Sequence, residues 1–163
     1  MIEYRIATDE DIELLVRSRM DTLRAVNRLE PGYRFSGGFL EASRKYFLEG
    51  DQATVLALDS GQVVGCASVC YMTVMPTFLH PTGRRAHLMN VYTDPGRRRQ
   101  GIAEKMVSML IEAAWDRGAT EISLDATESG RPLYRRLGFR DSAECMVLTR
   151  QAWDQNEAKR ERP

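Results

Sequence analysis

Residues 93–105 read TDPGRRRQGIAEK and join an expected strand to an expected helix. Apolar side chains at Ile102, Met106 and Leu110 follow at helical spacing, which predicts an amphipathic helix from about Gln100. Three arginines at 97–99 stand just before that helix. The partial positive charge of a helix N-terminus favours acidic residues there, so the sequence concentrates positive charge at an unfavourable place.

A bound anion would explain this arrangement. Arg98, Gly101 and Ala103 place small residues at the turn from strand to helix, where a ligand can approach the backbone closely. The first N–H groups of a helix have no partner within it, so they can bind an anion such as a phosphate. The hexapeptide alone leaves a second interpretation open, namely a solvated arginine turn before an ordinary helix.

A known family has this pattern. The segment Arg98-x-x-Gly101-x-Ala103 resembles motif A of the GNAT superfamily of N-acetyltransferases, (Gln/Arg)-x-x-Gly-x-(Gly/Ala). About thirty residues later, SGRPLYRRLGF resembles motif B of that family through Tyr134, Gly138 and Phe139. The resemblance covers roughly residues 2–150.

The hydrophobic pattern predicts an α/β (α+β) fold in the order β-α-α-β-β-β-α-β-α-β(-β). The strands over about 53–72 form a hairpin around DSGQ and continue as an antiparallel meander. The unit at 86–125 is a parallel crossover. The resemblance implies a GNAT-like mixed, mostly antiparallel central sheet of about six to seven strands with about four flanking helices and splayed parallel strands at the cofactor site. We expect one acetyltransferase domain at 1–150, with its last strands within 139–150, and a frayed polar C-terminal tail at 151–163.

The resemblance also implies the cofactor, acetyl-CoA, and its site. The pantetheine arm would pair with backbone of Val91 and Thr93, between the strand that ends there and the strand at 121–125. The pyrophosphate would lie on the amides of the helix start, with Arg98 at the first motif position; these amides belong to Arg99, Gln100, Gly101, Ile102, Ala103 and Glu104. Thr127 stands where many members have an Asn that contacts CoA. Which arginine of 97–99 meets the 3′-phosphate stays open.

The implied reaction is direct attack of a primary amine on acetyl-CoA in a ternary complex. The oxyanion needs a preorganised donor, and we expect a backbone N–H near Val91 to Thr93, exposed by a bulge. Tyr134 would protonate the CoA thiolate; the alternative is a core tyrosine. His87 is the candidate base, because without a bulge it shares a strand face with Met89 and Val91. A water chain is the alternative base.

Composition narrows the remaining function classes. The chain has 163 residues, zero formal net charge, no apolar run near the length of about 18 that spans a membrane, and three cysteines without a CxxC. We therefore expect a cytoplasmic protein with no metal, nucleic-acid or membrane partner. The resemblance implies that the acceptor, a small-molecule or peptide amine, binds between about 20–40 and 73–86. A homodimer, a non-catalytic CoA-binding or regulatory module, and a nucleic-acid binder that uses the arginines are further hypotheses.

Overall fold

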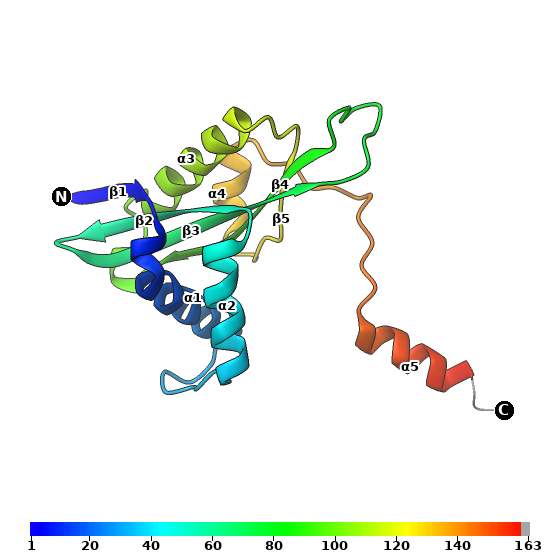
Figure 1. Ribbon diagram of the computed structural model, residues 1–163, viewed down its shortest axis with the longest axis horizontal. Helices are drawn as coiled ribbons and strands as arrows, with labels where there is room; N and C mark the ends of the chain where they lie inside the picture. Colours follow the sequence, from blue (N-terminus) through cyan, green and yellow to red (C-terminus); the bar gives the residue numbers. More distant parts are fainter. Residues whose placement is uncertain (161–163) are drawn as a thin grey trace.

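A single five-stranded sheet organises the computed structural model, which describes residues 1–160 (Figure 1). The strands lie in chain order across the sheet and are β1 (Ile2–Ile6), β2 (Gln52–Asp59), β3 (Gln62–Thr73), β4 (Arg84–Thr93) and β5 (Ile122–Leu124). The helices are α1 (Ile12–Asn27), α2 (Gly37–Glu49), α3 (Ile102–Asp116), α4 (Arg131–Arg136) and α5 (Arg150–Arg160), with short 3-10 turns η1 (Asp9–Asp11) and η2 (Pro95–Arg97).

The predicted antiparallel meander is confirmed. β1, β2, β3 and β4 each pair antiparallel with the next strand. The β2–β3 hairpin turns at Ser60 and Gly61, whose φ angles are 51° and 80°. Two residues with positive φ give a turn whose twist matches that of the flanking strands, so the two-residue connection is favourable.

The predicted parallel crossover is confirmed as well, but the two parallel strands pair over a short stretch. β4 and β5 pair in parallel over three positions, from Ala86–Ile122 to Leu88–Leu124, and α3 provides the connection. β4 then continues to Thr93, whereas β5 ends at Leu124. The outer edge of β4 beyond Leu88 therefore has no strand partner within residues 1–160.

Both faces of the sheet are covered, because successive side chains of β2 point to opposite sides. Val55 and Ala57 join a core with α3, which buries Ile102, Met106 and Leu110 on one face. Leu56 and Leu58 join a second core with α1 and α2 on the other face, and this core includes Leu15, Phe47 and Cys66. α4 lies on the α3 side, where Tyr134 and Leu137 pack against the first core. Figure 1 shows α1 and α2 on one side of the sheet and α3 on the other.

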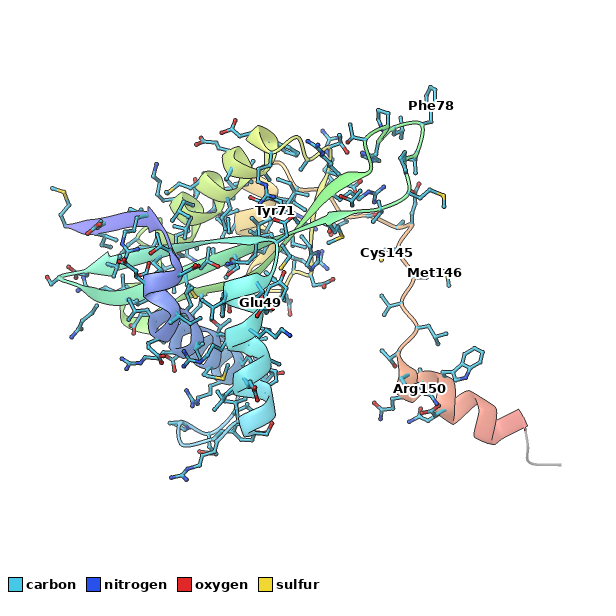
Figure 2. The ribbon with its side chains drawn as sticks, in the orientation of Figure 1. Glu49, Tyr71, Phe78, Cys145, Met146 and Arg150 are labelled. Carbon is cyan, nitrogen blue, oxygen red and sulfur yellow. The ribbon has the colours of Figure 1, made fainter. Side chains whose placement is uncertain are left out.

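The C-terminal part differs from the expectation. The sheet has five strands within residues 1–160, fewer than the predicted six to seven, because residues 140–149 make no strand pairing. β5 presents only three residues at that edge. The segment instead runs away from the sheet, carrying Cys145 and Met146, and α5 lies apart from the domain (Figures 1 and 2). Most of the expected tail at 151–163 lies in α5, which spans Arg150–Arg160, and residues 161–163 lie outside the described chain; its fraying stays a prediction. The division at residue 150 stays a prediction.

Candidate active site

The candidate anion cradle lies at the start of α3. α3 begins at Ile102, two residues later than predicted, because Gly101 and Arg99 both adopt left-handed backbone conformations with φ of 76° and 63°. Lys105 N–H is the first helical donor and donates to Gly101 C=O, so the N–H groups at 101–104 precede it and have no partner within the helix. A Cβ at Gly101 would meet no atom within 4 Å, so the space over these amides is open to a ligand.

Close packing holds the cradle against the sheet. Ile102 is 1% exposed and anchors the first turn of α3 in the core. A Cβ at Gly65 on β3 would lie 3.2 Å from the Ile102 side chain and 3.0 Å from Met106 Cε and Tyr92 C=O. Gly65 therefore permits the close approach of α3 that fixes the cradle beside the end of β4.

The three arginines have different partners. Arg97 pairs with Asp59 at the end of β2. Arg98 Nε donates to Thr93 C=O at 3.2 Å, which ties the loop to the end of β4. Arg99 is exposed, and within residues 1–160 its side chain makes no ion pair at 4 Å or less. Arg99 is thus the arginine of the three with a guanidinium free for a ligand.

A β-bulge interrupts β4 next to the free edge. β3 residues Cys66 and Ser68 are two apart, yet their partners Tyr92 and Met89 are three apart, so β4 contains one extra residue. Asn90 lies within this bulge with φ of 58°, a conformation that asparagine adopts more readily than most residues. The expected bulge is therefore present, and it lies at Asn90 and Val91.

The bulge decides which groups point to the free edge. Asp94 N–H donates to Val64 C=O on β3, so by alternation the main-chain groups of Val91 and Thr93 point away from β3. The side chain of Val91 packs with the α3 core, whereas Tyr92 packs with the α1 core. The buried Thr93 Oγ1 has no hydrogen-bond partner within the described residues. An orphaned hydroxyl beside open main-chain groups fits a ligand that hydrogen-bonds along this edge.

A chain of buried polar side chains supports Asn90. Asn90 Nδ2 donates to Ser68 Oγ at 3.2 Å, and Ser68 Oγ lies 2.7 Å from Thr54 Oγ1. On its other side, Arg19 from α1 donates to Asn90 Oδ1 at 3.3 Å. Asn90 C=O accepts a hydrogen bond from the thiol of Cys66 at 3.5 Å. These bonds fix both the side chain and the backbone of the bulge residue.

The candidate base His87 lies on the α1–α2 side of β4. Its Nδ1 lies 2.8 Å from Ser123 Oγ on β5, and its Nε2 lies 3.6 Å from the Asp125 carboxylate. It shares a face with Met89, as expected. The expectation that it also shares a face with Val91 is wrong, because the bulge turns Val91 to the α3 side.

Tyr134 lies on the opposite side of the sheet. Its ring packs edge-on against Phe139 with 5.9 Å between ring centroids, and both rings contact the α3 core. Burial raises the pKa of the Tyr134 hydroxyl, so this group keeps its proton at neutral pH. Thr127 has a structural role in the same region, since its Oγ1 accepts a hydrogen bond from Gly130 N–H at the start of α4.

A cavity of about 430 Å³ opens beside the bulge on the α1–α2 side. Its wall is mostly apolar and aromatic and comes from α1, α2, β2, β3 and β4; it includes Arg19, Phe39, Tyr46, Phe47, Cys70, Met89 and Asn90. The two helices contribute as expected, but the loop at 74–83 does not line the cavity. Figure 2 shows Phe78 at the tip of that loop, pointing away from α1 and α2.

The cysteines of the site are not activated thiols. Burial raises the pKa of the Cys66 thiol to about 11, so it remains protonated at neutral pH. Cys70 lines the cavity and contacts Met89 Sδ at 3.4 Å. Neither arrangement places a histidine against a thiol as an acyl-enzyme route requires.

Comparison with known proteins identifies the family. Residues 20–139 match the model of the acetyltransferase (GNAT) family. The chain belongs to this family. Both motifs and the bulged strand lie within the matched residues.

Individual curated relatives match only part of the chain, at modest sequence identity. The chain is 31% identical to a glucosamine 6-phosphate N-acetyltransferase of Trypanosoma brucei brucei over 89 residues, which are 55% of this chain and 58% of that protein. It is 36% identical to a thialysine N-epsilon-acetyltransferase of Sus scrofa over 67 residues, 39% of each chain. The chain thus spans about two fifths to three fifths of the length of these curated relatives.

Solved structures match over almost the whole chain. A predicted acetyltransferase of Clostridium acetobutylicum, crystallised with acetyl-CoA, is 31% identical with a TM-score of 0.80, and the match covers 91% of this chain and 96% of that one. A GCN5-related N-acetyltransferase of Ralstonia eutropha is 25% identical with a TM-score of 0.72 and similar coverage, 91% and 99%.

The described residues offer neither a membrane-spanning helix nor a cluster of metal-ligating side chains. No helix there is both long and apolar enough to cross a membrane. The same residues contain no group of three or more His, Cys, Asp or Glu side chains that could hold a metal ion.

Sequence reasoning missed Asn90, Arg19 and Gly65. The signal for Asn90 was available, since an asparagine inside the strand pattern HLMNVYT marks a position that tolerates positive φ. The roles of Arg19 and Gly65 had no local signal, because each depends on contact with an element far along the chain.

The backbone conformation at Asn90 leads to a stability prediction. Asn90→Val and Asn90→Gly both remove the side-chain hydrogen bonds, but only valine is strained at a φ of 58°. We expect Asn90→Val to have a free energy of unfolding about 1–3 kcal/mol below that of Asn90→Gly, despite the greater unfolded-chain entropy of glycine. Urea unfolding measures this difference. Equal stability of the two variants would show that the bulge does not need a left-handed residue.

Proposed function

We propose that this protein transfers the acetyl group of acetyl-CoA to the primary amine of a small molecule by direct attack within a ternary complex. The observation that carries the proposal is the open edge of β4 at Val91 and Thr93, which leads to the cradle at Gly101. The similar structure from Clostridium acetobutylicum contains acetyl-CoA. The names of two relatives specify glucosamine 6-phosphate and thialysine as acceptors, which supports a small-molecule amine over a peptide.

Backbone groups hold the cosubstrate in this proposal. The pantetheine amides pair with the main-chain groups of Val91 and Thr93, as a further strand would. The pyrophosphate accepts hydrogen bonds from the N–H groups at 101–104, and the positive end of the α3 dipole stabilises its charge. Arg99, with its free guanidinium, is our candidate for the 3′-phosphate. Thr127 contributes less, because its hydroxyl already accepts a hydrogen bond from Gly130 N–H.

The acceptor binds in the cavity beside Asn90, on the face of β4 opposite α3. The amine then attacks the thioester carbonyl, a C–N bond forms and the C–S bond breaks. A backbone N–H of the bulge donates to the carbonyl oxygen as negative charge develops on it; removing one such donor typically costs about 10²–10³ in rate. The rigid side-chain support of Asn90 keeps this donor in place without reorganisation.

Two side chains move the protons. His87 takes a proton from the attacking amine, directly or through water, and the Asp125 carboxylate at 3.6 Å stabilises the imidazolium that results. Tyr134 gives its proton to the sulfur of CoA as the thiolate leaves. The raised pKa of Tyr134 suits this role, because the donor must be protonated before the reaction.

Cofactor binding is tested first. A ligand at about one hundred times its dissociation constant stabilises a protein by about 2.7 kcal/mol, so acetyl-CoA and CoA should both raise the melting temperature by several degrees, and ATP much less. Gly101→Asp places a carboxylate in the open space over the cradle and should abolish both shifts. The control Gly61→Asp alters a hairpin glycine that also has a positive φ and open space. Unchanged acetyl-CoA affinity in Gly101→Asp would remove the cradle as the phosphate site.

The role of Tyr134 is tested by deleting one oxygen atom. Tyr134→Phe keeps the ring packing with Phe139 but lacks the proton, so turnover should fall about 10²-fold or more while acetyl-CoA affinity changes little. Release of the CoA thiol measures turnover, and calorimetry measures affinity. Full activity of Tyr134→Phe would leave the residue with a packing role only.

The role of His87 is tested by the pH dependence of the rate. If His87 is the base, the wild-type pH–rate profile has an acid limb that depends on this side chain. His87→Ala should be slower and should lack this acid limb, whereas the control His80→Ala should keep it. An acid limb that persists in His87→Ala would assign the base to water.

The alternative is a CoA-binding or regulatory module that does not catalyse. The same thiol-release assay separates the two. Binding of CoA without thiol release, over an acceptor panel that includes both named acceptors, would favour the module.

A further inference from the structure

One charged side chain in the candidate acceptor cavity lacks an opposite charge. Arg19 comes from α1 and is half-buried in the cavity wall. Its one side-chain hydrogen bond within the described residues joins Nη1 to Asn90 Oδ1 at 3.3 Å. No carboxylate lies within 4 Å of it in that part of the chain, although twelve other pairs of an arginine or lysine with a carboxylate form there.

The surroundings of Arg19 make this arrangement costly for the free protein. The cavity wall contains no Asp or Glu, and aromatic and sulfur-containing side chains form much of it. Burial lowers the pKa of Arg19, because the charged guanidinium loses hydration that the bond to Asn90 replaces only in part. A guanidinium has five N–H donors in a planar fork, and a single bond to Asn90 leaves most of them available. Such a fork matches the two oxygens of a carboxylate or a phosphate.

We infer that Arg19 binds an anionic oxyacid group, a carboxylate or a phosphate, on the acceptor amine. The inference rests on the proposed function, since it assigns a chemical class to the acceptor of that site. The acceptor is thus an amine that also carries a negative group, with a carbon skeleton against Phe39, Phe47 and Met89. A polyamine fits poorly, because its second cation would find no carboxylate in the wall and would face Arg19.

The position of Arg19 beside the bulge also favours an acceptor that carries an anionic group. Arg19 contacts the side chain of Asn90, and Asn90 forms the bulge next to the reaction centre. An anion held by Arg19 therefore fixes one end of the acceptor close to the oxyanion donor. The positive charge of Arg19 also disfavours the protonated form of a nearby amine, which makes the neutral nucleophile easier to form.

Matched pairs of amines test the inference on the CoA-loaded protein. The pairs are 6-aminohexanoate and hexylamine, L-phenylalanine and 2-phenylethylamine, and glucosamine 6-phosphate and glucosamine. We expect the member that carries the carboxylate or phosphate in at least one pair to bind about tenfold or more tightly than the amine that lacks it, as measured by calorimetry. The carboxylate and phosphate pairs show which of the two groups the site takes.

Variants at position 19 assign the preference to this side chain. Arg19→Met keeps a long apolar side chain but no charge, and should reduce the preference to less than threefold without changing CoA affinity. Arg19→Lys should keep part of the preference, because it retains the charge without the fork. The matched control is Arg17→Met, an exposed arginine on the same helix, which should retain the full preference.

The outcomes separate this inference from the proposed function. Equal binding within every pair, no binding of any anionic member, or an unchanged preference in Arg19→Met overturns the inference. Thiol release with neutral amines only would leave the acetyltransferase proposal standing while the inference falls. Binding of an anionic member that Arg19→Met abolishes, without thiol release, would keep the anion site and remove the transferase proposal.

Discussion

The left-handed conformation of Asn90 in β4 is the constraint on which the site depends. One extra residue there reverses the side-chain alternation of the strand, so that Val91 packs toward α3 while Met89 and Asn90 face the cavity. The same residue directs the main-chain groups of Val91 and Thr93 to the edge that β5 leaves open. Without the bulge, the outward main-chain groups beyond Leu88 would fall on other residues, and the side chain of Val91 would face the α1–α2 side.

The positive charge before α3 is stabilised by specific partners. Asp94 Oδ1 accepts a hydrogen bond from Gly96 N–H at 2.8 Å, which closes the turn that carries the arginines. Arg97 pairs with Asp59, and Arg98 bonds to the backbone of Thr93. The carboxylate of Glu104 in the first helical turn lies 3.2 Å from Arg136. These contacts hold a positive loop over a helix start at modest cost, which leaves the amides and Arg99 for an anionic ligand.

The sequence predicted the parts of the structure that have local causes. Small residues at Gly101 and Ala103, helical spacing in α3 and the turn at Ser60 and Gly61 follow from neighbours in the chain, so the cradle, the meander and the crossover were all expected. The bulge was expected in the right part of β4, but its exact residue was not. Because the bulge residue was not known, the Val91 side chain was expected on the same face of β4 as His87. One extra residue inverts the side-chain alternation and turns Val91 to the other face.

Features with distant causes were not predictable in this way. Arg19 and Asn90 are 71 residues apart, and their contact depends on how α1 crosses the sheet. The apolar residues at 146–148 indicate a strand, but a strand needs a partner edge, and β5 offers only three residues. The loop at 74–83 was assigned to the acceptor site from its place in the chain, whereas it extends away from α1 and α2 (Figure 2).

The two halves of the site differ in how much side-chain identity they require. The β4 edge and the α3 start present backbone N–H and C=O groups, so they need few particular residues beyond Gly101, Ala103 and a bulge. A short motif can therefore identify the cofactor site. The cavity presents side chains from α1 and α2, outside both motifs, and its chemistry depends on which residue stands at a position such as 19. Because the two halves differ in this way, residues 98–139 are enough to predict the family. The proposed acceptor class depends instead on the three-dimensional contacts of Arg19.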